Sequence, residues 1–159
     1  MTPAAGCRLV LSDEFSQEAL GARLADVCTV PMLIFLEGDL GAGKTTLARG
    51  FLRGLGHRGA VKSPTYTLIE PYEIDGRKVY HLDLYRVADP AELDYLGLRE
   101  MLAEEAVLLI EWPERGAGWL PPADLQIFIR HHAGGREITL AAPGPRGEGP
   151  LSKLCDHFQ

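Results

Sequence analysis

The sequence predicts an α/β protein, a P-loop NTPase-like three-layer sandwich with a mixed, mainly parallel sheet. Residues 38–45 are glycine-rich and stand between an apolar run of strand length and a segment of helical period, the order typical of phosphate-binding loops. Strands interleaved with helices favour a sheet covered on both faces. Two turn signals, Asp75-Gly76 and Gly134-Gly135, lie between strand-like segments and predict hairpins.

The first half of the chain predicts two strand–helix pairs. Residues 8–11 form a short strand, and Ser16 is expected to cap the helix that follows. The inner face of that helix is expected to carry Leu20, Leu24 and Val27. Residues 32–36 form an apolar strand, and the helix after the glycine-rich loop is expected to end at Gly56. The apolar stripe of this second helix consists of Leu47, Phe51 and Leu55.

The second half predicts two hairpins separated by a helix and a central strand. The hairpin strands are expected at residues 65–74, 78–84, 125–131 and 137–141. Between the hairpins, Asp89 precedes Pro90 and is followed by Glu92, a pattern that starts helices. Gly97 is expected to break this helix, which then resumes towards Glu104. Residues 106–110 are apolar without alternation, as expected for a strand buried on both faces.

The chain is expected to form one domain followed by a tail. A length of 159 residues suits a single core, which we assign to residues 1–142 as a P-loop ATPase domain. Residues 143–159 begin with a glycine- and proline-rich stretch. They are therefore predicted to be a flexible linker and a short C-terminal tail.

Composition narrows the function and the location. The net charge is −6 and no basic run occurs, which disfavours direct nucleic-acid binding because phosphate contacts need clustered Lys and Arg. Cys7, Cys28 and Cys155 are widely spaced, so no disulfide framework is expected, and this usage suits a reducing cytosol. The N-terminal residues lack a basic segment followed by an apolar run, so we expect no signal peptide, and no apolar run in the sequence reaches ~20 residues. We expect a cytoplasmic protein with protein partners and no membrane contact.

Residues 38–45 have the sequence GDLGAGKT, which matches the phosphate-loop pattern GxxxxGK[ST] in full. Glycines let backbone amides approach phosphate oxygens, and the following helix points its N-terminus at the negative charge. Lys44 is expected to reach the β- and γ-phosphates and Thr45 to bind Mg²⁺. The expected nucleotide contacts in this segment are Asp39, Leu40, Gly41, Ala42, Gly43, Lys44, Thr45 and Thr46.

A phosphate loop needs an acidic partner for its metal, and two residues are candidates. Glu111 ends the central apolar strand, at the edge where ligands of α/β sheets bind. We assign Mg²⁺ to Thr45 and Glu111, against the alternative that Glu111 is a solvated strand end. Asp83 shares a strand face with His81 and Tyr85. It either orients the attacking water or a metal-bound water, or is a structural carboxylate paired with Arg86 or a backbone amide.

Thr65 belongs to a Ser-Pro-Thr-Tyr-Thr segment between the second helix and the next strand. A hydroxyl in such a loop can sense the γ-phosphate, although a hydroxyl beside proline is also ordinary turn chemistry. Both interpretations stand at this point. By composition alone, Trp112 is more typical of a core aromatic than of a functional one.

Taken together, the motifs resemble those of the bacterial TsaE (also called YjeE) family. The segments that carry the resemblance are GDLGAGKTT at 38–46, SPTYT at 63–67, HLDLYR at 81–86 and IEW at 110–112. The resemblance runs from about the first helix to the Gly134-Gly135 hairpin. It implies that Lys44, Asp83 and Glu111 are catalytic, and that Trp112 and Arg136 contact the nucleotide.

The same resemblance implies a role in making threonylcarbamoyladenosine beside the anticodon of certain tRNAs. Members of that family are ATPases that join TsaD and TsaB partners and do not transfer the threonylcarbamoyl group themselves. The implied cofactors are ATP and Mg²⁺, and the protein is expected to contact tRNA only indirectly, through the complex with TsaD and TsaB. No arginine is obviously placed to stabilise the transferring phosphate, although Arg86 is a candidate, so weak activity alone and stimulation by partners are expected.

Two other functions stay open. A small P-loop kinase of a metabolite would need an acceptor site and an arginine-rich lid, and the sequence indicates neither. A nucleotide-sensing subunit would bind the nucleotide without hydrolysing it. The sequence has no evident Asn-Lys-x-Asp segment for reading guanine, which favours ATP.

Overall fold

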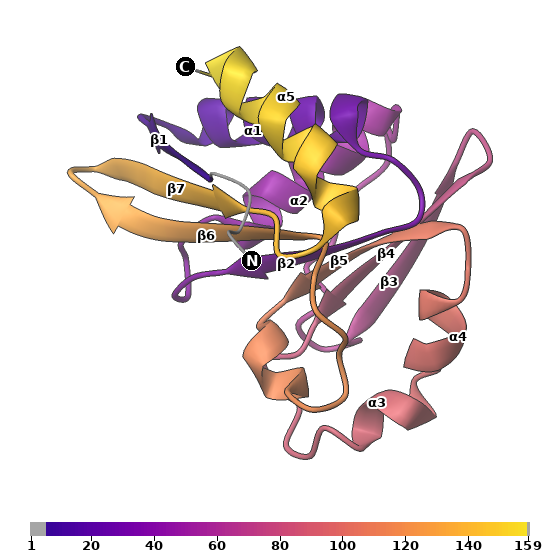
Figure 1. Cartoon of the computed structure of the whole chain (residues 1–159). Coiled ribbons are helices and arrows are strands. Elements are labelled where there is room, and N and C mark those ends of the chain that lie inside the picture. Colours follow the sequence, from indigo (N-terminus) through magenta and orange to yellow (C-terminus); the bar gives the residue numbers. More distant parts are fainter. Residues whose placement is uncertain (1–5, 159) are drawn as a thin grey trace.

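The computed structural model describes residues 6–158 and contains one seven-stranded sheet with helices on both faces (Figure 1). The strands stand in the order β1-β7-β6-β2-β5-β4-β3. Their bounds are β1 Cys7–Leu11, β2 Met32–Glu37, β3 Ile69–Ile74, β4 Arg77–Asp83, β5 Ala106–Glu111, β6 Leu125–His132 and β7 Gly135–Ala141. Each predicted strand is present, with the first hairpin strand beginning at Ile69 rather than at residue 65.

The sheet is mixed, with its parallel part at the centre. β2 pairs parallel with β5 and β6, and β4 pairs parallel with β5. The β3–β4 and β6–β7 hairpins and the β1–β7 pair are antiparallel. The expectation of a mainly parallel sheet is therefore corrected to a partly parallel one, because both hairpins and the first strand add antiparallel pairs at the flanks.

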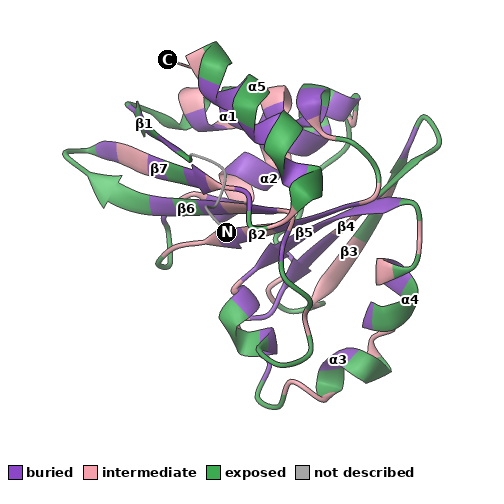
Figure 2. Ribbon diagram, in the orientation of Figure 1, coloured by how far each residue is buried: buried purple, intermediate pink, exposed green. Residues whose placement is uncertain are grey.

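Helices α1 (Glu14–Val27), α2 (Lys44–Leu55) and α5 (Glu148–Phe158) cover one face of the sheet (Figure 1). The main core lies between these helices and the sheet, where Leu20, Leu24 and Phe51 are fully buried. As Figure 2 shows, buried residues follow the inner sides of these helices and the central strands.

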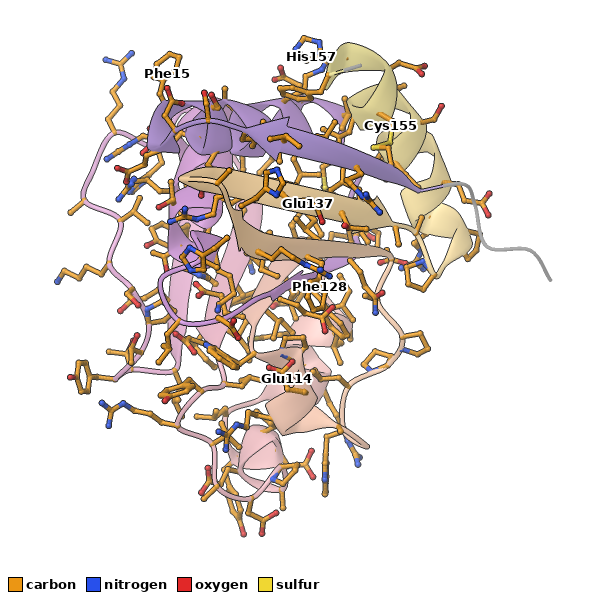
Figure 3. All side chains as sticks on the ribbon, turned by 90° about the vertical axis from the view of Figure 1, so that its left-hand side faces the viewer. Phe15, Glu114, Phe128, Glu137, Cys155 and His157 are labelled. Carbon is orange, nitrogen blue, oxygen red and sulfur yellow. A yellow bond between two sulfur atoms is a disulfide. The ribbon has the colours of Figure 1, made fainter. Side chains whose placement is uncertain are left out.

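The opposite face is covered only in part. The short helices α3 (Glu92–Tyr95) and α4 (Leu98–Leu102) pack a second core against β2, β4 and β5. No helix among residues 6–158 covers the β6–β7 end of this face, where Phe128 remains 43% exposed (Figure 3). The predicted helix break at Gly97 is confirmed by its left-handed backbone, with φ of 83°, although the resumed helix ends at Leu102 rather than near Glu104.

The start of α1 differs from the prediction in its capping residue. Asp13 is the N-cap, and its carboxylate accepts a hydrogen bond from the backbone N–H of Ser16 at 2.8 Å. Ser16 instead stands in the first turn, where its hydroxyl donates to the same carboxylate oxygen at 2.6 Å. A carboxylate at this position adds a favourable interaction with the positive end of the helix.

The C-terminal segment is folded onto the core rather than extended as a linker. After a short 3₁₀ turn at Pro145–Gly147, α5 buries Leu151, Leu154 and Cys155 in the main core. The expected flexible linker and tail at residues 143–159 is corrected accordingly for residues 145–158.

Cys155 forms a disulfide with Cys7 of the edge strand β1, across a sequence separation of 148 residues. In Figure 3, Cys155 faces the sheet edge from α5. The expectation of no disulfide framework is corrected by this one disulfide, which forms because α5 packs beside β1 and so brings together two cysteines that are far apart in the sequence. Cys28 is the free thiol of the described chain, and burial raises its pKa to about 12.

The described residues contain no helix that is both long enough and apolar enough to cross a membrane.

Candidate functional site

The phosphate loop connects β2 to α2, as the sequence predicts. Gly38, Gly41 and Gly43 have φ values of 150°, 75° and 115°, which side chains rarely adopt. A Cβ on Gly38 would lie 2.3 Å from the carbonyl oxygen of Ile129 on the neighbouring strand. Only glycine fits at this position, and it allows the chain to turn directly after β2 into a loop that can bind a ligand at the N-terminus of α2.

A pocket of about 280 Å³ opens over this loop. It gathers most of the residues that the sequence singled out, from four separate parts of the chain. Its lining consists of Leu40, Gly41, Ala42, Gly43, Lys44, Thr45, Thr46, Ser63, Thr65, Asp83, Glu111 and Trp112. Asp39 and Arg136, which were also expected to contact the nucleotide, do not line this pocket.

The ammonium of Lys44 is bound by the loop itself. Its Nζ donates to the carbonyl oxygens of Gly38 and of Asp39, the latter at 3.0 Å. The same nitrogen lies 4.1 Å from the ring centroid of Trp112, within range of a cation–π interaction. Burial lowers the pKa of Lys44, and attraction from Glu111 and Asp83 opposes that shift.

Thr45 and Glu111 meet at the floor of the pocket. The Thr45 hydroxyl lies 3.0 Å from Oε2 of Glu111 and 3.3 Å from Oε1. Glu111 is only 2% exposed because β5, at whose end it stands, lies between β2 and β4. A hydroxyl and a carboxylate side by side are the oxygen ligands that Mg²⁺ takes from proteins that bind it with phosphate. The described chain holds no cluster of three or more metal-binding side chains, and Mg²⁺ with a nucleotide needs only one or two.

Asp83 stands beside Glu111 on the neighbouring strand, and the two are register partners. Its carboxylate accepts hydrogen bonds from the backbone N–H of Tyr85 at 3.0 Å and from the Thr65 hydroxyl at 3.3 Å. Burial raises the pKa of Asp83, the Tyr85 N–H lowers it, and repulsion from Glu111 raises it further. Asp83 thus contacts a backbone amide, as expected of a structural carboxylate. It also lines the pocket, as required of a residue that orients water.

Thr65 and Trp112 both line the pocket. Thr65 shares a hydrogen bond of 2.7 Å with the hydroxyl of Ser63. Trp112 directly follows Glu111, has a left-handed backbone with φ of 57°, and its ring lies 4.9 Å from that of Tyr85. Trp112 therefore lines the pocket rather than the centre of the core, contrary to the expectation from composition alone.

The two arginines considered from the sequence lie outside the phosphate pocket. Arg86 places its guanidinium 4.3 Å from the ring centroid of Tyr66. Arg136 donates through Nε to the carbonyl oxygen of Ala42 at 2.7 Å and through Nη2 to that of Gly41 at 3.2 Å. Arg136 thus holds the backbone of the phosphate loop from the side of the β6–β7 hairpin.

Sequence reasoning gave no role to two buried polar residues of the site. His81 is completely buried and its Nε2 lies 2.6 Å from Oε2 of Glu111. Gln17 lies on the buried face of α1, against the loop residue Gly43. Two features of the sequence could have indicated them. His81 shares a strand face with Asp83, and Gln17 stands three residues before Leu20 on the apolar face of a helix.

Comparisons with known proteins show the family to which the chain belongs. Residues 11–138 match the family described as "Threonylcarbamoyl adenosine biosynthesis protein TsaE". The tRNA threonylcarbamoyladenosine biosynthesis protein TsaE of Haemophilus influenzae is 46% identical over 151 residues, which cover 92% of this chain and 96% of that protein. The protein of the same name from Bacillus subtilis is 43% identical over 126 residues, which cover 79% and 78% of the two chains. A crystal structure of Bacillus subtilis YdiB matches with a TM-score of 0.85 at 32% identity and covers 100% of both chains.

Proposed function

This chain belongs to the TsaE family, and from that membership and the geometry of its site we propose that it is a Mg²⁺-dependent ATPase. Its proposed role is that of an accessory subunit required for threonylcarbamoyladenosine modification of tRNA, acting on a complex of TsaD-like and TsaB-like proteins. Threonylcarbamoyladenosine biosynthesis is the process named for its relatives. In this proposal the partner proteins, and not this chain, transfer the threonylcarbamoyl group.

One observation carries the proposal: Thr45 and Glu111 lie 3.0 Å apart at the foot of a complete phosphate loop. The loop amides and the N-terminus of α2 would bind the phosphates of ATP. Thr45 and Glu111 would hold Mg²⁺, which neutralises developing charge on the phosphates when bound. Lys44 would exchange its two loop carbonyls for phosphate oxygens.

We assign to Asp83 the positioning of the water that attacks the γ-phosphate. Its carboxylate is held by Tyr85 and Thr65, so its orientation is fixed before the substrate arrives. The Thr65 hydroxyl donates to Asp83. Through this hydrogen bond, a loop that senses the γ-phosphate would affect the residue that positions the water. Trp112 forms the wall against which Lys44 rests.

No arginine lines the phosphate pocket within residues 6–158. An arginine directed at the transferring phosphate is worth about 10³–10⁵ in turnover. We therefore propose slow hydrolysis by the isolated protein and stimulation by its partners. Leu40 and Tyr66 are 64% and 81% exposed next to the site, which supports contact of a partner protein at this edge.

The charge of the protein supports protein partners over direct contact with tRNA. The net charge is −6, whereas a surface that grips phosphates needs clustered positive charge. We propose that the protein contacts tRNA only through the partner complex and that it works in the cytoplasm, where tRNA and ATP are found.

Phosphate release from Mg-ATP, measured alone and with purified TsaD and TsaB partners, tests the proposal. Lys44→Ala and Glu111→Ala should abolish a partner-dependent rate that the wild type shows. Equal rates with and without partners would refute the accessory role. Phosphate transferred to a small acceptor would indicate the kinase instead, and tight binding without any release would indicate the sensor.

A further inference from the structure

Arg86 and Tyr66 form a cation–π pair beside the phosphate pocket. The Arg86 guanidinium lies 4.3 Å from the ring centroid of Tyr66. Tyr66 directly follows Thr65, which lines the pocket. Arg86 stands three residues after Asp83, which lines it as well and accepts a hydrogen bond from the Thr65 hydroxyl at 3.3 Å. The pair therefore joins the two chain segments that meet at this end of the pocket.

The positive charge of Arg86 is not neutralised by any carboxylate of the described chain. Within residues 6–158 its guanidinium forms no ion pair, and the side chain is exposed. A cation–π contact at an exposed site is weak, whereas the paired hydrogen bonds of a guanidinium with a phosphate are strong. Arg86 can therefore leave the ring of Tyr66 at little cost when a phosphate lies within reach.

The phosphate pocket is poor in positive charge at the end formed by Asp83 and Thr65. Among the described residues that line it, Lys44 is the one cation, while Asp83 and Glu111 contribute two carboxylates. Lys44 is bound at the phosphate loop. An arginine directed at the transferring phosphate is worth about 10³–10⁵ in turnover, and Arg86 is the arginine that stands closest to Asp83 in the sequence.

We infer that Arg86 contacts the γ-phosphate during hydrolysis, and that Tyr66 holds it outside the pocket in the isolated protein. The inference rests on the proposed ATPase and adds a catalytic residue to it. The water oxygen bonds to the γ-phosphorus, the bond from that phosphorus to the bridging oxygen breaks, and ADP, phosphate and a proton are released. Arg86 donates hydrogen bonds to the γ-phosphate oxygens as charge develops on them and forms no covalent bond.

The exposed ring of Tyr66 connects this step to the partner proteins. Tyr66 is 81% exposed, so a partner surface that packs on its ring competes with the guanidinium for the same π face. Arg86 then leaves the ring, and the phosphates beside Asp83 attract its charge. Stimulation by partners follows because their binding frees a residue that this chain already carries.

Single-turnover phosphate release with purified TsaD and TsaB partners tests the catalytic role. Arg86→Ala should lower the partner-stimulated rate by about 10³-fold. It should change the dissociation constant of ATP by less than about twofold, because the contact forms only as the phosphate reacts. Arg115→Ala is the matched control, since this guanidinium also lies near an aromatic ring, 5.7 Å from that of Tyr85. It should keep the wild-type rate, and a loss of rate in Arg115→Ala alone would overturn the assignment.

Two further measurements separate contact with phosphate from a role in docking. ADP with aluminium fluoride resembles the transferring phosphate, and the complex should trap it with the wild type but not with Arg86→Ala. Arg86→Ala should also bind the partners as tightly as the wild type does, and free guanidinium ion should restore part of its rate. If the variant loses partner binding together with its rate, Arg86 is a docking residue and the catalytic assignment is wrong.

The isolated protein tests the role of Tyr66. Tyr66→Leu removes the ring, and the slow rate without partners should rise about two- to fivefold, the equilibrium effect of an exposed cation–π contact. Tyr66→Phe keeps the ring and should stay slow. Tyr95→Leu, which replaces another exposed tyrosine, should leave the rate unchanged. An equally slow Tyr66→Leu would refute the holding contact, as would a rise that persists when Arg86→Ala is added.

The inference and the proposed function can fail separately in these experiments. If the wild type hydrolyses ATP with its partners and Arg86→Ala does so at the same rate, the arginine assignment is wrong and the ATPase stands. If the wild type releases no phosphate in the complex, the proposed ATPase fails, and the inference fails with it.

Discussion

His81 and Glu111 form a buried pair in which Nε2 of the imidazole lies 2.6 Å from Oε2 of the carboxylate. The same carboxylate oxygen accepts the hydroxyl of Thr45 at 3.0 Å. Nδ1 of His81 is buried and has no partner among residues 6–158, so the contact with Glu111 through Nε2 is the ring's hydrogen bond within the site. The carboxylate is thus oriented from two sides before any metal binds.

Replacing His81 should change the requirement for Mg²⁺. His81→Asn lacks the reach of Nε2, so Glu111 loses a donor and we expect the Mg²⁺ concentration for half-maximal partner-stimulated ATPase to rise about 10–100-fold. His81→Gln carries its amide nitrogen further out and should restore much of the affinity. An unchanged Mg²⁺ dependence in His81→Asn, with the fold intact by circular dichroism, would exclude this positioning role.

Asp83→Asn should stabilise the protein while it impairs hydrolysis. Because folding raises the pKa of this carboxyl, its contribution to stability is present below the usual aspartate range and is lost as pH rises through the higher folded value. At neutral pH the charged form is therefore unfavourable, and the neutral amide should gain about 1 kcal/mol, or roughly 2–4 °C in Tm. Thermal melts at pH 7 and pH 4 should show the gain at pH 7 only.

In the same variant, partner-stimulated phosphate release should fall by at least about 100-fold, the range of a general base or positioning group. ATP binding should persist, since Asp83 does not contact the loop. A destabilised Asp83→Asn would contradict the direction of the pKa, and a fully active one would contradict the role in water positioning.

Arg136→Met should loosen the phosphate loop. The guanidinium makes two hydrogen bonds to loop carbonyls, and charge-assisted bonds contribute about 1.5–3 kcal/mol each when well buried. Part of this group is exposed, so we expect a loss of about 1–2 kcal/mol in unfolding free energy and weaker binding of both ATP and tripolyphosphate. Arg136→Lys should not rescue it, because an ammonium lacks the planar fork that reaches two carbonyls.

Reduction of the disulfide should lower the melting temperature. Cys7 and Cys155 close a long loop, and such cross-links contribute about 2–5 kcal/mol. Melts with and without dithiothreitol should differ by at least about 5 °C, and Cys155→Ser should melt like the reduced protein under both conditions. Cys28→Ala, which removes the free thiol, should keep the full response to reductant.

The thiol of Cys28 should resist alkylation by iodoacetamide at pH 8 in the folded protein, because burial raises its pKa to about 12 and keeps it protonated.

Features with a local cause could be predicted from the sequence. The phosphate loop, both hairpins and the central strand depend on glycines, turn pairs and apolar runs within a few residues, and the structure contains all of them. Helix α5 was missed because Gly149 and Pro150 suggest a linker. In the structure they stand in the first turn, where proline removes no helical hydrogen bond, and Leu151, Leu154 and Cys155 then follow at helical spacing.

Contacts that depend on register or on distant elements could not be predicted in this way. Asp83 and Glu111 become neighbours only because β4 and β5 pair in parallel with that register. The contact of Arg136 with the phosphate loop requires β6 to lie beside β2. Helix periodicity places Gln17 on an inner face, but only the packing of α1 against α2 brings it to Gly43.

The link between β1 and α5 turns nearly the whole chain into a covalent ring. Residues 7–155 lie inside this ring. A machine that unfolds proteins by pulling on one terminus would have to displace β1 and α5 together, because the sulfur–sulfur bond transmits the pull from either element to the other. In the reduced protein the same pull falls on β1, which pairs with a single neighbour, β7. The oxidation state of two cysteines far from the nucleotide site would thus decide how readily the molecule is dismantled from its ends.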